Sequence, residues 1–196
     1  MISELNNSEN QKATDLIKKG FKMAGSTLES VLKNPVLVKY IEYNINSVLS
    51  GVKSNNKATI LKTDLIGDLS GTSYLILSND DVQKIYQTCL PKELHPESNE
   101  DLLNMKIDFL TEIDNMVSAA FITEISNVLN VEIFGQVPII CQMEIAEVQP
   151  YLEDQSNSLK TFVHFKAEFE ISNMTIKPDF VWIFHKSFLK LIKSKF

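Results

Sequence analysis

Apolar residues recur along this chain at two different spacings, and the spacing changes where Gly, Pro, Asn and Asp gather. After about ten polar residues, apolar side chains return every three or four positions up to Asn34. They do so again over 101–130, so the pattern predicts two long amphipathic helices. Over 58–78 and 161–184 the residues are β-branched, aromatic or alternating, which predicts two β-hairpins. The chain is therefore expected to mix helices with antiparallel strands.

Turn and capping residues set the limits of these elements. Asn34-Pro35 ends the first long helix, because the residue before proline is biased away from helix. Ser98, followed three residues later by Asp101, fits a capping box at the start of the second. The other predicted elements are at least one strand within 36–48, strands at about 58–66 and 71–78, a helix over 79–90, a solvated loop over 92–99, an extended segment over 131–143, strands over 161–171 and 177–184, and a helix over 187–195.

The order helix, strand, hairpin, short helix occurs twice, and the two copies also match in sequence. An offset of 97 aligns the apolar positions of the long helices, and an offset of 107 aligns the last strand and short helix of each half. The alternative is that any two amphipathic helices align equally well. The aligned pairs are Leu16 with Ile113, Leu28 with Ile125, Val31 with Val128, Leu32 with Leu129, Val36 with Ile133, Tyr74 to Leu77 with Val181 to Phe184, and Ile85 with Ile192.

Two such halves predict a single α+β domain. Their strands would merge into one mostly antiparallel sheet, with the two long helices side by side on one face. We therefore expect a disordered N-terminus over 1–11 and one domain over 12–196. That domain would consist of two degenerate repeats, at about 12–91 and 99–196.

Composition excludes several classes of partner. A net charge of −6 without a basic cluster argues against nucleic acid and anionic membranes, because both require Lys and Arg gathered on one face. Neither a signal peptide nor a run of about 20 apolar residues is present, so we expect a soluble, cytoplasmic protein. Cys89 and Cys141 lie in apolar surroundings with no zinc-binding spacing, which favours buried free thiols.

The most informative polar residues are Asp108, Glu112 and Asn115, followed after 22 further residues by Pro138. At 3.6 residues per turn, the first three fall within roughly 60° of arc and form one polar stripe opposite the apolar side of the helix. Two carboxylates and an amide in this arrangement could bind a hard cation, act as acid and base, or simply form a solvated face.

Other catalytic patterns have no support in the sequence. His95, His164 and His185 are scattered over a loop and the C-terminal hairpin, so neither a metalloprotease motif nor a catalytic triad can be drawn. Gly67 and Gly71 lack the lysine and the following helix of a phosphate-binding loop. The polar stripe is the only candidate that these patterns leave.

The spacing Asp108-x3-Glu112-x2-Asn115-x22-Pro138 resembles the signature of the CheC, CheX and FliY phosphatases of bacterial chemotaxis, which dephosphorylate the response regulator CheY. All four positions match, and the resemblance covers roughly residues 12–193. It implies that Asn115 orients the attacking water and that Glu112 pairs with the regulator's active-site lysine. Asp108 and Pro138 would contribute binding contacts or shape the neighbouring backbone. The protein would need no cofactor of its own, since the regulator supplies Mg²⁺.

The first half departs from the two-site members of this family. Gln11, Asp15 and Lys18 stand where a second site would be, and an ammonium cannot accept a hydrogen bond from water. One live motif in the second half is most similar to the CheX branch, whose members associate through their sheets, so the resemblance implies a homodimer. Two rival classes stay open: a docking module for a response regulator or flagellar switch component that binds without turnover, and an unrelated domain in which the motif is coincidental.

Overall fold

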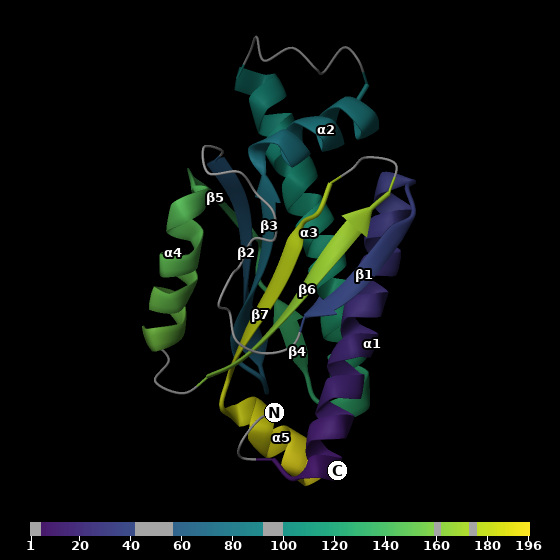
Figure 1. Ribbon diagram of the computed structural model, residues 1–196, viewed down its shortest axis with the longest axis vertical. Helices are drawn as coiled ribbons and strands as arrows, with labels where there is room; N and C mark the ends of the chain where they lie inside the picture. The colour runs from purple at the N-terminus through teal and green to yellow at the C-terminus, as the bar shows by residue number, and fades with distance from the viewer. Residues whose placement is uncertain (1–4, 42–56, 92–99, 159–161, 173–175) are drawn as a thin grey trace.

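The computed structural model describes residues 5–41, 57–91, 100–158, 162–172 and 176–196. Seven strands form one antiparallel sheet in the order β1-β6-β7-β3-β2-β4, with β5 also paired to β2 (Figure 1). The predicted α+β class is confirmed. The strands are β1 (Val36–Ile41), β2 (Lys57–Gly67), β3 (Gly71–Ser78), β4 (Ile133–Gly135), β5 (Ile139–Glu144), β6 (Phe162–Ile171) and β7 (Asp179–His185). The helices are α1 (Asn7–Leu32), α2 (Asn79–Cys89), α3 (Glu100–Leu129), α4 (Ile145–Ser158) and α5 (Ser187–Lys195).

The two halves of the sheet have matching strand orders. From one edge the order is β1, β6 and β7, and from the other edge the corresponding strands are β4 or β5, then β2, then β3. The first strand of each half crosses to the other half: β1 pairs with β6, while β4 and β5 pair with β2. Both long helices end in a left-handed residue with φ of 55°, at Lys33 and Asn130, which are 97 positions apart. The backbone therefore follows the two-half layout at its strand order and at its helix ends.

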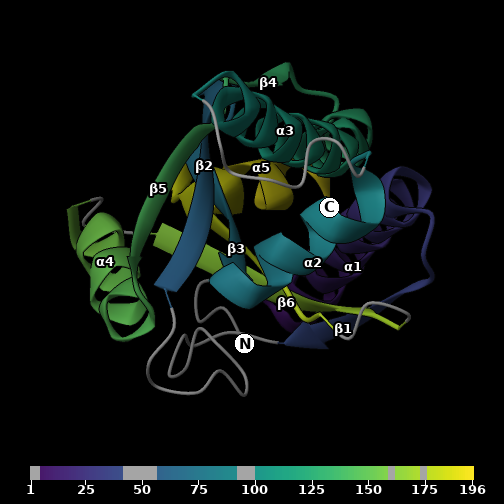
Figure 2. The ribbon, with the colours of Figure 1, turned by 90° about the horizontal axis from the view of Figure 1, so that it is seen from above.

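The two long helices lie side by side on one face of the sheet (Figure 2). Gly20 permits their close approach, because a Cβ there would lie 2.8 Å from the ring of Phe121. The Phe121 ring in turn stacks on Trp182 of β7, with ring centroids 4.2 Å apart. Trp182, Phe121 and Phe21 are all fully buried. This aromatic layer joins both helices to the centre of the sheet.

The opposite face of the sheet carries a second, smaller core. Val148 and Leu152 of α4 are fully buried there against alternate residues of β2, β3 and β7. This side of β2 carries Ala58 and Ile60, whereas the next residue, Leu61, contributes to the core beneath the two long helices, as the alternation of a strand requires. The sheet is thus covered by helices on both faces.

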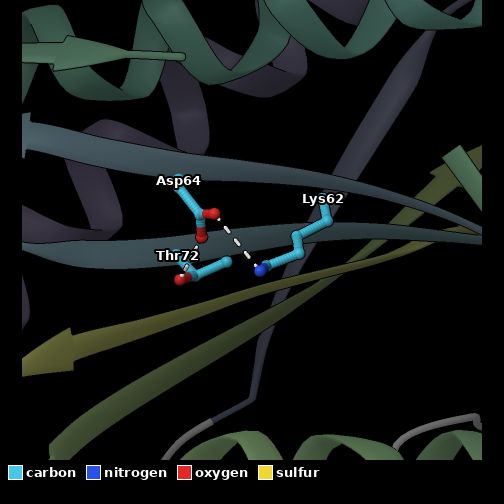
Figure 3. Close-up of polar contacts among 3 residues, drawn as sticks. All are labelled: Lys62, Asp64 and Thr72. Atoms are coloured by element: carbon cyan, nitrogen blue, oxygen red, sulfur yellow. Dashed lines mark hydrogen bonds and ion pairs between the residues drawn. The ribbon is translucent and has the colours of Figure 1, made fainter. Parts of the chain in front are cut away.

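Beyond α4, the same face becomes polar. Lys62 Nζ lies 3.2 Å from Asp64 Oδ2, and the Thr72 hydroxyl donates to Asp64 Oδ1 at 2.8 Å (Figure 3). In the hairpin of the first half Asp64 lies opposite Thr72, and in the hairpin of the second half Glu168 lies opposite Asp179. The positions of the second half that match this polar group are therefore also polar. These matched residues are Lys166, Glu168 and Asp179, all buried, with Lys166 Nζ 3.1 Å from Asp179 Oδ1.

Two elements differ from the sequence prediction. α4 was not predicted, because Pro150 and a mostly polar sequence obscure the helical spacing of Val148 and Leu152. α1 begins at Asn7 rather than near residue 12, since Asn6 and Glu9 form a capping box. The predicted strand beyond Ile41, the loop over 92–99 and the capping role of Ser98 lie outside the described residues. Among the helices that the structure describes, none is long and apolar enough to cross a membrane.

We expect Gly20→Ala to destabilise the fold by about 1–3 kcal/mol, the usual cost of overpacking a core. Helix propensity alone would give the opposite sign, because alanine is favoured over glycine by about 1 kcal/mol in a helix. Urea unfolding measures the difference, with Lys19→Ala on the exposed side of α1 as the neutral control. A stability gain in Gly20→Ala would show that the helices do not meet as closely as described.

Candidate functional site

The three polar residues of the motif lie on the solvent side of α3. Asp108, Glu112 and Asn115 are all exposed and fall within two turns of this helix. The stripe therefore faces away from the core, as its spacing predicts. Of the apolar residues on the other side of α3, Leu110, Ile113, Val117 and Phe121 are buried and Val128 is half-buried.

Apolar side chains flank this stripe. Met105 and Met116 are 49% and 41% exposed, and Ala119 is exposed one turn beyond Asn115. On a helix these positions lie within about 80° of Asp108, so they border the polar residues instead of joining the core. The motif alone does not indicate them. Methionine side chains are flexible, so this border of the stripe can change its shape.

Pro138 lies in an irregularity of the strand that follows α3. β4 and β5 both pair with β2, but three residues, 136–138, stand opposite only two of β2, Thr63 and Asp64. The extra residue makes a β-bulge, a feature found at sheet edges and beside active sites. Pro138 has no N–H to donate and is buried, whereas Val137 beside it is 80% exposed. Pro138 is thus part of an irregular backbone segment, and its role in shaping that segment stays a prediction.

A buried polar network lies directly beneath the stripe. Asp114, the residue before Asn115, is fully buried and accepts a hydrogen bond of 2.6 Å from the Thr63 hydroxyl on β2. Its other carboxyl oxygen accepts from Ser118 Oγ at 3.5 Å, and Ser118 is 3.2 Å from Ser73 Oγ on β3. Side chains of one helix and two strands thus meet at the level of Asn115. Local sequence patterns do not reveal this network, because its members are 45 and 51 residues apart.

The matched face of the first half is built differently. Gln11, Asp15 and Lys18 are exposed on α1, at the positions that correspond to the motif on α3. The Gln11 side-chain amide donates to Asp15 Oδ1 at 2.9 Å. The amide of this face is therefore used within the helix, and the position matching Asn115 carries an ammonium that only donates.

Histidines and cysteines contribute little to this site. His185 is exposed at the end of β7, where its Nδ1 accepts from the Ser187 amide at 3.3 Å. His95 lies outside the described residues. Cys89 and Cys141 are half-buried free thiols, and burial raises the pKa of both. No group of three or more His, Cys, Asp or Glu side chains in the described ranges is arranged to hold a metal ion.

This fold is that of the CheC, CheX and FliY chemotaxis proteins, and the fold expected from the motif is confirmed. The chain is similar to FliY of Thermotoga maritima, with a TM-score of 0.63 at 16% identity over 100% of this chain and 98% of that chain. It is similar to the CheX–CheY–BeF3–Mg²⁺ complex of Borrelia burgdorferi, with a TM-score of 0.54 at 16% identity over 87% and 97%. It is also similar to the FliG–FliM complex of H. pylori, with a TM-score of 0.59 at 13% identity over 97% and 100%. No protein-family model and no curated protein matches the sequence.

The buried carboxyl predicts a particular pH dependence of stability. Burial raises the pKa of Asp114 from 3.8 to about 7, although the hydroxyls of Thr63 and Ser118 partly oppose this shift. Between about pH 4 and pH 7 the folded protein retains a proton that the unfolded chain has lost, so stability falls as pH rises through this window. Above about pH 7 the effect levels off.

We therefore expect the free energy of unfolding of the wild type to decrease, relative to Asp114→Asn, by up to about 4 kcal/mol between pH 4 and pH 7.5. Denaturant unfolding at several pH values measures this difference. Asp179, whose pKa burial also raises to about 7 despite Lys166, is present in both proteins and cancels in the comparison. A difference that is independent of pH would contradict the prediction.

Proposed function

We propose that this protein hydrolyses the aspartyl phosphate of a CheY-like response regulator. The observation that carries the proposal is the exposure of Asp108, Glu112 and Asn115 on one face of α3, in a fold shared with CheX and FliY. The solved CheX–CheY complex supports a CheY-like protein as the partner. The reaction belongs to two-component signalling, in which hydrolysis returns the regulator to its inactive state.

An aspartyl phosphate needs little chemical assistance. The oxygen of water forms a bond to phosphorus while the bond to the aspartate oxygen breaks, and the carboxylate leaves with the electron pair. Since a carboxylate has a pKa near 4, it leaves without a general acid, and the proton of the attacking water passes to the phosphate product. The phosphoryl charge is balanced by Mg²⁺ bound to the regulator, so this chain need not bind a metal. What remains is to position the water.

Asn115 has the chemistry for that task. Its amide oxygen accepts a hydrogen bond from water and its amide nitrogen donates one, so the side chain can hold a water in line with phosphorus without acting as a base. Glu112 lies one turn earlier on the same face and is assigned to the regulator's active-site lysine, from which its carboxylate accepts a charged hydrogen bond. Asp108 is the outer contact of the stripe. The two roles require both side chains to reach one partner surface, which their shared face allows.

The flanking apolar residues fit a protein partner. An interface core excludes water with apolar and methionine side chains, and charged groups at its edge set the orientation. Met105 and Met116 supply exposed apolar area beside the carboxylates, and Val137 is exposed in the bulge that contains Pro138. A small phosphate ester offers no surface for these residues. The composition of this face therefore favours a phosphoprotein over a small-molecule substrate.

A second function is supported by the similarity to FliM. The chain matches the FliG–FliM complex of H. pylori over 97% of its length, at a TM-score comparable with the CheX match. On this alternative the domain binds a regulator or a flagellar switch component without turnover. Incubation of the protein with a radiolabelled phospho-CheY of the same organism separates the two: loss of label faster than spontaneous hydrolysis supports the phosphatase, while binding without loss supports the docking module.

Asn115→Ala should lower phosphatase activity at least 100-fold, because the water loses its positioning group. Stability should not fall, since an exposed asparagine in a helix is replaced by a better helix former. The matched control is Lys18→Ala, the corresponding exposed position of α1, for which we expect turnover within a factor of about two. Label release and thermal unfolding are measured together. A loss of stability that accounts for the loss of activity would assign Asn115 a structural role.

Glu112→Lys should weaken binding of the regulator as well as turnover, because it places like charges against each other. We expect Kd to rise about tenfold at low salt, with a smaller change in concentrated salt. Titration calorimetry measures the affinity, and Asp15→Lys on the matched face of α1 applies the same change of charge away from the candidate site. Equal weakening by both variants would show that net charge, not an ion pair with Glu112, governs binding.

A further inference from the structure

We infer that Asp114 is a positioning residue of the candidate site, because its buried carboxyl fixes the helix that carries Asn115 to the neighbouring strands. The inference rests on the proposed function, which it deepens by adding a residue that does not itself touch the substrate. Three observations support it: the hydrogen bonds beneath the stripe, the residues at the matched positions of the first half, and the position of the bulge.

The hydrogen bonds constrain the rotation of α3 about its own axis. Successive residues of a helix point about 100° apart, so Asp114 faces inward where Asn115 faces outward. Thr63 holds one carboxyl oxygen of Asp114 at 2.6 Å, and the other oxygen is 3.5 Å from Ser118, which contacts Ser73. A rotation that breaks these contacts moves Asn115 by the same angle. Apolar packing alone tolerates such rotations better, because dispersion contacts are not directional.

The first half shows that the fold itself does not require this network. Ile17 and Phe21 of α1 match Asp114 and Ser118, and the edge of the Phe21 ring faces Phe180 with centroids 6.1 Å apart. Burying a carboxyl is unfavourable compared with burying an apolar group of similar size. The same architecture thus uses the more favourable solution in the half without a site. The hairpin registers complete the comparison by matching Thr63 to Ala167 and Ser73 to Phe180.

The network also connects the two separated parts of the motif. In sequence, 22 residues separate Asn115 from Pro138, but Asp114, which precedes Asn115, and the bulge that contains Pro138 meet at the same point of β2. Thr63, which binds the residue before Asn115, is one of the two residues that stand opposite the bulge containing Pro138. The site helix and the bulge therefore take their positions from one strand residue. Loss of the hydrogen bond between Asp114 and Thr63 should therefore change the position of α3 relative to the bulge.

The test replaces the Asp114–Thr63 pair of the network by the matching residues of the first half. Asp114→Ile with Thr63→Ala reproduces Ile17 and Ala167, whereas Asp114→Asn keeps an oxygen that can accept from Thr63. Leu152→Ala truncates the core on the opposite face of the sheet and controls for stability loss alone. For each protein, kcat and KM for the radiolabelled phospho-regulator, the unfolding midpoint, and residual dipolar couplings of the α3 amides are measured. These couplings vary periodically along a helix and report its direction and its rotation.

For the double variant we expect kcat to fall at least tenfold, KM to change less than about threefold, and the phase of the coupling wave along α3 to shift. Its unfolding midpoint should equal or exceed that of the wild type, because both polar partners are replaced. Asp114→Asn should retain most of the wild-type kcat, and Leu152→Ala should keep both kcat and the coupling phase while losing stability.

Unchanged couplings in the double variant would overturn the inference, as would a shifted phase with unchanged kcat. If the wild type releases no label at all, the proposed function fails, and the couplings alone then decide the inference. In that case, a shifted phase in the double variant and an unshifted one in Asp114→Asn would support Asp114 as the residue that sets the orientation of α3.

Discussion

The close contact between α1 and α3 over the sheet determines which side of each helix can meet a partner. Gly20 removes the Cβ that would collide with Phe121, and Phe121 then stacks on Trp182 of the sheet. Because both long helices bury one side in this contact and another against the strands, a single stripe of each is left to solvent. On α3 that stripe carries Asp108, Glu112 and Asn115. The location of the candidate site is thus a consequence of how the helices pack.

The sheet contributes the second constraint. Its central strands, β3 and β7, are buried on both faces, so their positions are fixed by packing from two sides. β2 connects this fixed centre to the edge of the sheet, because it pairs with β3 on one side and with β4 and β5 on the other. A bulge opposite Thr63 and Asp64 interrupts the regular pairing of β2 with β4 and β5, and Val137 in this bulge is exposed to solvent. An irregular edge on a rigid centre can present residues beside α3 without loosening the core.

The sequence could predict those elements that bury many regularly spaced apolar residues. The buried side chains of α1, α3 and the two hairpins recur at regular spacings, and these spacings predict the elements. The same spacing places the motif on the solvent-exposed side of α3. α4 was missed because it buries few residues, Val148 and Leu152 among them, in a smaller core and contains Pro150. The polar network was missed for a different reason. A carboxyl at Asp114 gains partners only after folding brings β2 beside α3, and no local spacing records that contact.

At the matched positions of the two long helices, the halves differ both in the exposed residue and in the buried residue beneath it. Where the exposed face of α3 carries Asn115, the residue beneath is Asp114 in a hydrogen-bonded network. Where the exposed face of α1 carries Lys18, the residue beneath is Ile17 in an apolar core. If the buried carboxyl served only stability, the apolar arrangement would suit both helices, since it avoids the cost of desolvation. Its presence under Asn115 alone is explained when the exposed amide must be held at a fixed angle, because directional hydrogen bonds restrict rotation in a way that an apolar contact does not.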